Sequence, residues 1–338
     1  MNNENILITG VAGFIGSFLA KRLLESGNVV IGVDNLNDYY DTNLKESRLN
    51  NLQTYDNFKF IKSDISKKEI ILDVFKNEKP TVVINLAAQA GVRYSIVNPD
   101  VYMESNVQGF FNILEACRKY PVKHLIYASS SSVYGNNKNV PFKEEDRVDY
   151  PVSLYAASKK TNEMMAYTYS HLYNIPTTGL RFFTVYGPMG RPDMAYFGFT
   201  DKFFNNEPIA IYNNGDFEND LYRDFTYVDD IVEGVSRLIS LPPSSEDGNV
   251  PSTIFNIGNN NPVKLMDFIS TLENALSKSL NREVTFQKVF EPMKPGDVPA
   301  TYASIEKLNK ITGFKPQTPL EKGLQKFTDW YVDYYKKK

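Results

Sequence analysis

Cysteine, histidine and tryptophan are scarce in this chain of 338 residues, which contains one Cys, two His and one Trp. The single Cys117 cannot form an internal disulfide, so we expect a protein of a reducing compartment, the cytoplasm. His124 and His171 stand in no metal-ligand spacing, and we therefore expect no metal site.

Long hydrophobic runs and an excess of one charge are also missing. No apolar run approaches the ~18 residues of a membrane span. Residues 1–5 lead into an apolar strand without a signal-peptide pattern. A net charge of −3 argues against nucleic acid or a membrane surface as a partner. The hydrophobic and charged contents, 42% and 23%, are typical of a soluble enzyme, and this length predicts two lobes.

A strand, a glycine-rich turn and a helix open the chain. The apolar run 5–9 predicts the strand, and 17–25 has a helical pattern. The turn between them has the spacing G-x-x-G-x-x-G, which lets backbone amides reach a pyrophosphate at a helix N-terminus. The alternative is a tight turn without a ligand. The residues of this turn that we assign to a dinucleotide are Gly10, Gly13, Phe14, Ile15 and Gly16.

The second apolar strand, 28–33, ends at Asp34. A carboxylate at this place can accept the hydroxyls of an adenosine ribose and would repel a 2′-phosphate. NAD is therefore favoured over NADP as the cofactor.

Strands and helical patterns then alternate as far as residue 184. We expect strands at 58–63, 81–85, 123–128 and 176–182, and helices at 67–77, 99–120 and 154–173. This rhythm predicts a Rossmann-like, doubly wound parallel sheet of the α/β class, whose ligands bind beyond the carboxyl ends of the strands. The small residues at 86–91 suit a flat cofactor or form an ordinary loop. The other residues at these ends that we assign to the cofactor are Asn35, Asp64, Ile65, Leu86, Ala87, Ala88, Gln89 and Phe182.

Prolines, asparagines and glycines interrupt the rhythm after residue 184. We expect residues 1–184 to form an NAD-binding domain that carries the catalytic residues. Residues 185–338 should form mainly a smaller α/β substrate lobe, with some segments returning to the first domain. The elements expected there are short strands at 209–212, 223–227 and 253–257, and helices at 229–241, 263–280 and 320–335.

Tyr155 and Lys159 lie one helical turn apart and share a face of the predicted helix. A neighbouring ammonium favours the phenolate, which is a general base that works near neutral pH. Ser130, at the end of the fifth strand, could bind the same substrate hydroxyl. This arrangement suits removal of a proton from an alcohol while a hydride leaves its carbon. The alternative is a chance spacing in a chain with 22 Tyr, but the dinucleotide features at the same sheet edge favour catalysis.

Across nearly its whole length the chain resembles extended short-chain dehydrogenases/reductases that act on nucleotide sugars. The motifs that carry this resemblance are 10–16, 129–135, 155–159, 223–229 and 295–297. Three longer stretches, 34–41, 187–195 and 293–302, are similar to UDP-glucuronate 4-epimerases of the bacterial capsule type. Two residues depart from that pattern, Lys294 in place of Gln and Ser304 in place of Asp.

The resemblance implies an NAD-dependent isomerase that interconverts UDP-glucuronate and UDP-galacturonate. Tyr155 would take the proton of the C4 hydroxyl while the hydride passes to tightly bound NAD, and the 4-keto sugar would turn over before the hydride returns. Lys159 would lower the pKa of Tyr155 and hold the nicotinamide ribose, and Ser130 would bind the reacting oxygen. Asn106 would form hydrogen bonds near the cofactor.

A row of hydroxyl side chains indicates which sugar is bound. Ser130, Ser131 and Ser132, together with Thr184, could donate hydrogen bonds to a sugar carboxylate, and Arg191 could clamp it. Related 4,6-dehydratases and UDP-glucuronate decarboxylases carry a carboxyl group at the place of Ser132, so its absence disfavours those reactions. The alternative for Ser131 and Ser132 is a structural role at a strand end.

Other basic and aromatic residues are assigned to the substrate by the same resemblance. Arg223 would pair with the UDP diphosphate, or alternatively with Asp224 or Asp229. Arg93 would face the sugar or phosphate, or alternatively solvent. The remaining predicted substrate residues are Tyr212, Lys294, which would add a cation near the diphosphate, and Tyr302.

Apolar, aromatic helix faces at 101–114 and 164–172 exceed what one sheet face would cover. In the similar family such helices form a four-helix dimer interface, so we expect a homodimer. Three other functions stay open: a 4-epimerase of neutral UDP-glucose or UDP-N-acetylglucosamine, a UDP-glucuronate decarboxylase, and a non-catalytic NAD sensor. An intact Tyr155, Lys159 and Ser130 disfavours the sensor.

Overall fold

The computed structural model describes the chain except residues 1–3, 214, 217–219, 246–247, 293–299 and 338. Its larger lobe is built on a seven-stranded sheet in the order β10-β6-β5-β4-β1-β2-β3, with every neighbouring pair parallel. The predicted Rossmann-like fold is confirmed. The strands are β1 (Asn5–Thr9), β2 (Val29–Asp34), β3 (Phe58–Lys62), β4 (Val82–Asn85), β5 (His124–Ser130), β6 (Thr177–Phe182) and β10 (Ser252–Ile257).

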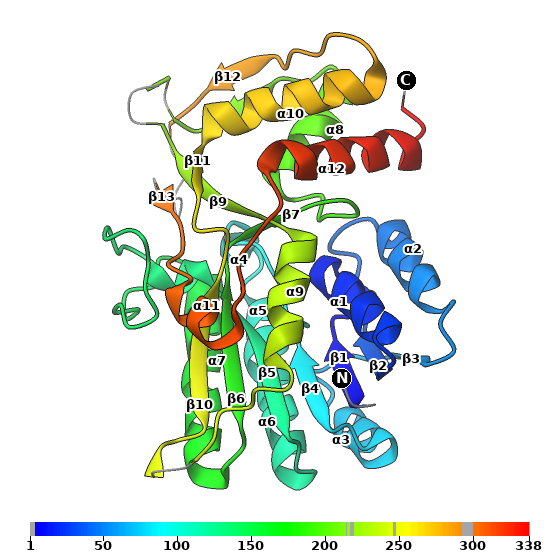
Figure 1. The fold of residues 1–338 in the computed structure, drawn as a ribbon, viewed down its shortest axis with the longest axis vertical. Helices are drawn as coiled ribbons and strands as arrows, with labels where there is room; N and C mark the ends of the chain where they lie inside the picture. The colour runs from blue at the N-terminus through cyan, green and yellow to red at the C-terminus, as the bar shows by residue number, and fades with distance from the viewer. Residues whose placement is uncertain (1–3, 214, 217–219, 246–247, 293–299, 338) are drawn as a thin grey trace.

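Helices cover both faces of this sheet (Figure 1). Successive residues of β1 point to opposite faces, and Ile6 and Ile8 pack in one core while Leu7 packs in the other. Both faces are thus buried, which explains why the parallel strands are continuously apolar. The first core is closed by α1 (Phe14–Glu25), α9 (Val228–Leu238) and α11 (Glu306–Thr312), and the second by α3 (Lys68–Glu78), α6 (Phe110–Lys119) and α7 (Leu154–Tyr173).

The expected long helix at 99–120 is present from Asp100 to Lys119, but part of its first half is a π-helix. The structure has α4 (Tyr94–Val97), the short α5 (Asp100–Tyr102) and a π-helical segment, η1 (Met103–Gly109), before α6 begins. In η1 the Asn106 side chain accepts a hydrogen bond from Gln89 N, 2.7 Å away, and donates one to Gln89 O, 3.0 Å away. A π turn fits one more residue into each turn than an α-helix, and such turns often lie at functional sites.

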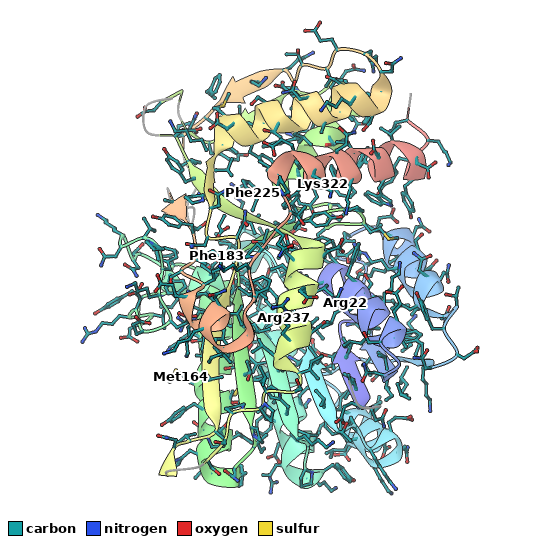
Figure 2. The ribbon with its side chains drawn as sticks, viewed as in Figure 1. Arg22, Met164, Phe183, Phe225, Arg237 and Lys322 are labelled. Atoms are coloured by element: carbon teal, nitrogen blue, oxygen red, sulfur yellow. The ribbon has the colours of Figure 1, made fainter. Side chains whose placement is uncertain are left out.

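The smaller lobe lies at the top of Figure 1, where α10 (Leu265–Leu280) and α12 (Leu320–Tyr334) run side by side. Its core is aromatic, and the rings of Phe225 and Phe268 stack 4.1 Å apart. Phe225 and Phe183, both labelled in Figure 2, also line the cavity described below. The other elements of this lobe are β7 (Thr184–Tyr186), α8 (Ala195–Phe204), β8 (Ile209–Ile211), β9 (Tyr222–Tyr227), β11 (Pro262–Lys264), β12 (Lys288–Phe290) and β13 (Ala300–Thr301).

Segments from the second half of the chain return to the larger lobe, as the sequence predicts. β10 pairs with β6 at the edge of the seven-stranded sheet. Helix α9 packs on α1, where Glu233 accepts hydrogen bonds from Arg22 and Arg237, which lie on neighbouring helices in Figure 2. The division at residue 184 itself stays a prediction. No helix among the described residues is both long and apolar enough to cross a bilayer.

Candidate active site

A cavity of about 1050 Å³ opens at the carboxyl ends of the parallel strands, between the two lobes. Nearly all of the predicted site residues line it. The exceptions are Asn106, which lies behind the lining at 1% exposure, and Tyr302, whose neighbour Thr301 lines the cavity instead. The Tyr302 carbonyl accepts a hydrogen bond from Phe142 N, so its backbone is held by the loop after β5. Lys294 lies outside the described residues.

The glycine turn is closed so tightly that larger side chains do not fit. Gly10 has φ +72°, and a Cβ on it would lie 2.7 Å from Ala87 N. A Cβ on Gly16 would lie 2.2 Å from Gly10 O. The turn ends at Gly13, the N-cap of α1, where free backbone amides and the helix dipole favour a phosphate.

The end of β2 holds a carboxylate in a fixed orientation. One Asp34 oxygen accepts a hydrogen bond from Ala12 N at 3.1 Å, and the other accepts one from Leu36 N at 2.9 Å. Asn35 Nδ2 donates to Asp64 Oδ2 at 2.8 Å, so two of the residues assigned to the cofactor are joined. Lys45, from the unpredicted helix α2 (Thr42–Leu52), also lines the cavity and donates to Asn37.

Helix α7 presents Tyr155 and Lys159, the candidate catalytic pair. It begins at a Ser153 N-cap, whose side chain accepts a hydrogen bond from Ala156 N, and this start places Tyr155 in the first turn. Tyr155 is hydrogen-bonded to Ser130. The Lys159 amine donates to Ala128 O at 2.9 Å, and burial lowers its pKa to about 8.

The electrostatics of Tyr155 correct one expectation. Burial raises the pKa of the Tyr155 hydroxyl, and this effect outweighs the hydrogen bond with Ser130 and the positive charge of Arg191, which both lower it. The predicted lowering by Lys159 is not found in this structure. The reason is that the Lys159 amine is buried and donates to a strand carbonyl.

The serine row lines the cavity. Ser130 Oγ accepts a hydrogen bond from Ser132 N at 3.1 Å, so Ser130 caps the 3-10 turn Ser131–Tyr134. The hydroxyls of Ser131, Ser132 and Thr184 line the cavity and have no hydrogen-bond partner in the described part of the chain. The structural capping role therefore falls to Ser130, and the other hydroxyls are available to a ligand.

An ion pair that the sequence interpretation missed lies behind the serine row. Arg181, on β6, donates from Nε and Nη2 to the Glu163 carboxylate at 2.8 and 2.9 Å. Ser129 Oγ donates to the same carboxylate at 2.7 Å, and Arg181 Nη1 donates to Tyr134 Oη at 3.0 Å. Glu163 lies two turns beyond Tyr155 on α7, so this buried network fixes the helix against the strand end that carries Ser130.

A second ion pair faces the cavity. Arg191 donates to Asp193 from Nε at 2.9 Å and from Nη2 at 2.6 Å. Tyr39 Oη donates to Asp193 at 3.3 Å, and its ring lies 4.8 Å from that of Tyr94. Tyr39 and Asp193 fall in stretches that carry the family resemblance, which is the one signal that could have singled them out. The loop that carries Arg191 and Asp193 is anchored by Arg48, which donates to Met189 O and Gly190 O in this loop and to Ala12 O in the glycine turn.

Three further predicted residues lie where the smaller lobe meets the cavity. The Arg93 guanidinium lies 4.7 Å from the centre of the Tyr212 ring, a cation–π contact. Arg223 Nη1 donates to Tyr222 O at 2.8 Å. The alternative pairing of Arg223 with Asp224 or Asp229 is not seen. Asp224 is buried and accepts backbone hydrogen bonds from Asn259, Asn260 and Ala303, and Asp229 lies 3.8 Å from Lys326.

A doubly wound sheet, a glycine turn at a helix N-terminus and a Ser–Tyr–Lys group at one cavity define a nucleotide-dependent enzyme of the short-chain dehydrogenase/reductase class. Residues 7–327 match the model of the GDP-mannose 4,6 dehydratase family, and the chain belongs to this family.

Three relatives narrow the comparison. Protein CapI of Staphylococcus aureus is 53% identical, over 98% of this chain and 99% of that protein. A probable UDP-glucuronate 4-epimerase of Rhizobium meliloti is 44% identical over 98% of both chains. The crystal structure of UDP-glucuronic acid 4-epimerase from Bacillus cereus, with UDP-glucuronic acid and NAD, is similar at a TM-score of 0.86. It is 31% identical and covers 98% of this chain and 99% of its own.

Proposed function

We propose that the protein is an NAD-dependent UDP-glucuronate 4-epimerase. One observation carries the proposal: the unpartnered hydroxyls of Ser131, Ser132 and Thr184 share a cavity with Arg191 and Tyr155. Hydroxyl and guanidinium donors suit a carboxylate beside the reacting carbon. The names of the relatives from Rhizobium meliloti and Bacillus cereus support the same reaction.

The dinucleotide half of the cavity fits NAD. A Cβ on Gly10, Gly13 or Gly16 would collide with backbone atoms, so the tight turn at the start of α1 needs these glycines. Such a turn suits a pyrophosphate, and the oriented carboxylate of Asp34 suits a ribose with free hydroxyls. Bound NAD would supply the acceptor and donor of the hydride at the sugar C4. The Bacillus cereus epimerase and its NAD complex support this choice of cofactor.

Within this proposal Tyr155 is the group that moves the proton. Its hydroxyl, hydrogen-bonded to Ser130, would take the proton of the C4 hydroxyl as that carbon is oxidised and return it when the 4-keto sugar is reduced. A buried lysine at hydrogen-bonding distance from Ala128 O would keep a positive charge near this site below about pH 8. A cationic nicotinamide would add to this charge and favour the phenolate.

The two ends of the substrate would meet different donors. The sugar carboxylate would lie against Ser131, Ser132, Thr184 and Arg191. Arg93, Tyr212 and Arg223, on the side of the smaller lobe, would hold the UDP part. The predicted contributions of Lys294 and Tyr302 remain part of the proposal.

A second candidate is a 4-epimerase of a neutral UDP-sugar. The observation that favours it is the Arg191–Asp193 pair, because a guanidinium already bonded to a carboxylate has less charge to offer a second one. The unpartnered hydroxyls of Ser131, Ser132 and Thr184 beside this pair still favour UDP-glucuronate as the substrate. Decarboxylation is disfavoured because Ser132 stands where an acidic group would be needed.

The test is to incubate purified protein with UDP-glucuronate, without added NAD, and to resolve the products. UDP-galacturonate is the expected product. UDP-xylose would show that the argument from Ser132 is wrong, and conversion of UDP-glucose or UDP-N-acetylglucosamine alone would favour the second candidate. Tyr155→Phe is the control for a contaminating activity. It should lower kcat by about 10²- to 10⁴-fold, the range for loss of a general base.

We also propose a cytoplasmic homodimer formed through a four-helix bundle. Apolar side chains stand out from η1 and α7, and among them Met164, labelled in Figure 2, is 61% exposed. Large exposed apolar side chains on neighbouring elements suit an interface. The others are Met103, Tyr167, Leu172 and Tyr173.

Light scattering at micromolar concentration should give the mass of a dimer. Met164→Arg should shift the mass toward that of a monomer. Ile70→Arg, at a residue on α3 with 48% exposure, is the matched control and should leave the mass unchanged. A monomeric wild-type protein would contradict the proposal.

A further inference from the structure

We propose that Asp193 is a positioning residue that shares Arg191 with the sugar carboxylate and keeps the guanidinium paired when that carboxylate leaves. The inference rests on the proposed function, because it needs an acidic sugar that turns over in the site. It assigns a role to a carboxylate that no step of the epimerisation itself uses.

The hydrogen bonds of Arg191 show how the sharing works. A guanidinium has five N–H donors arranged along two edges that each fit a carboxylate. Asp193 fills the edge formed by Nε and Nη2, at 2.9 and 2.6 Å. No described residue accepts from Nη1, so the second edge is left for a ligand. The side chains of the pair are 27% and 28% exposed, which leaves them accessible from the cavity that they line.

Tyr39, which also lines the cavity, holds Asp193. It lies in the loop after β2, and its hydroxyl donates to Asp193 Oδ2 at 3.3 Å. Burial and the nearby Asp193 anion raise the pKa of Tyr39 to about 12, so the hydroxyl keeps its proton and remains a donor. Gly91 makes room for it, because a Cβ at this residue would lie 2.7 Å from Tyr39 Oη.

The pair is close enough to the reacting group to matter. The charges of Arg191 and Asp193 shift the pKa of Tyr155 in opposite directions. The two charges therefore partly offset each other at the Tyr155 hydroxyl. When a sugar carboxylate arrives, the net charge around Arg191 becomes negative, and Coulomb repulsion from Asp193 weakens the hold on the sugar.

Weaker binding of the sugar carboxylate by Arg191 is useful during epimerisation. The hydride returns to the other face of C4 only after the ring has turned, so the carboxylate on C5 must leave its donors during every turnover. An Arg191 without a partner would be costly in the cavity at that moment. Asp193 satisfies the guanidinium throughout, which lowers the barrier to release.

The experiment compares Asp193→Asn with wild type for an acidic and a neutral ligand. Affinities for UDP-glucuronate and UDP-glucose are measured by calorimetry in a Tyr155→Phe background, where the sugar is not converted. Turnover is measured with Tyr155 intact. Asp229→Asn removes the same charge from an exposed residue outside the cavity and serves as the matched control.

We expect Asp193→Asn to bind UDP-glucuronate about tenfold more tightly and to lower kcat by about the same factor, with UDP-glucose affinity unchanged. Asp229→Asn should change none of these values. A residue that only holds the loop in place would instead weaken both ligands, and that result, or no change in UDP-glucuronate affinity, would overturn the inference. If wild type binds UDP-glucuronate without converting it, the proposed function fails, and the affinities alone still decide whether Asp193 shares Arg191.

Discussion

Two arginine–carboxylate pairs flank Tyr155, one behind the sheet end and one in the cavity. Arg181 and Glu163 are joined by hydrogen bonds of 2.8 and 2.9 Å, and Arg191 and Asp193 by bonds of 2.9 and 2.6 Å. In geometry the pairs are nearly the same. They differ in surroundings, because the side chains of the rear pair are 2–3% exposed and those of the front pair 27–28%.

The difference teaches that bond geometry alone does not assign a role to an ion pair. The rear pair is also bonded to Ser129, Tyr134 and the Glu144 carbonyl, so neither charge can leave without stranding the other in the protein interior. The front pair borders a cavity and can exchange its partner for a ligand or water. We therefore assign the rear pair to stability and propose a functional role for the front pair, and the following predictions test that division.

Glu163→Ala should have the largest effect. It leaves the Arg181 guanidinium buried without its main partner and should destabilise the fold by about 3–5 kcal/mol, measured as the free energy of unfolding in urea. A loss below about 1 kcal/mol would mean that water reaches Arg181. The rear and front pairs would then not differ in their contribution to stability.

The next largest effect should come from acid, which should lower the free energy of unfolding through the buried His124. His124, on β5, is fully buried and contacts Thr178 Oγ1 at 2.8 Å, and burial lowers its pKa to about 4. Since the unfolded chain takes up this proton near pH 6.5, the stability contributed by neutral His124 is complete above that pH. It is lost as pH falls toward 4, by about 3 kcal/mol.

The check is the slope of unfolding free energy against pH between 6.5 and 4. His124→Gln should flatten that slope, whereas His171→Gln, at an exposed histidine, should leave it as in wild type. Equal slopes in wild type and His124→Gln would contradict the prediction.

Arg191→Lys should separate function from stability in the front pair. Lysine keeps the charge but lacks the planar fork, so we expect kcat/KM for UDP-glucuronate to fall by about 10- to 100-fold. The free energy of unfolding should change by less than about 0.5 kcal/mol, as for most surface substitutions. A lower free energy of unfolding of Arg191→Lys, with unchanged kcat/KM for UDP-glucuronate, would contradict this prediction.

Asp193→Ala should have only a small effect on stability. Partly exposed ion pairs contribute about 0–1 kcal/mol, so its free energy of unfolding should stay within that range of wild type. Measured in the same urea series as Glu163→Ala, it compares the two pairs directly. A loss equal to that of Glu163→Ala would show that the front pair also holds the fold.

Local pattern was enough to predict the parallel sheet, because buried strands of apolar residues alternate with helical periodicity. It also placed Gly10, Asp34, Ser130 and Phe182 at strand ends, and all of them line one cavity. The same pattern missed the π turn at Met103–Gly109, since apolar spacing does not distinguish an α turn from a π turn. Local pattern also could not place β10 beside β6, because this position depends on pairing between segments that are distant in the chain.

The sequence by itself determined the glycine turn, the Tyr155–Lys159 pair and the serine row 130–132, because each of these lies within a few consecutive residues of one element or turn. Only the tertiary structure decided which carboxylate meets which arginine and whether water reaches the pair. Tyr39 and Asp193 are 154 residues apart, and Glu163 and Arg181 are 18 apart on different elements. The direction of the Tyr155 pKa was decided in the same way, since burial and the charges around a group come from segments that the chain brings together only by folding.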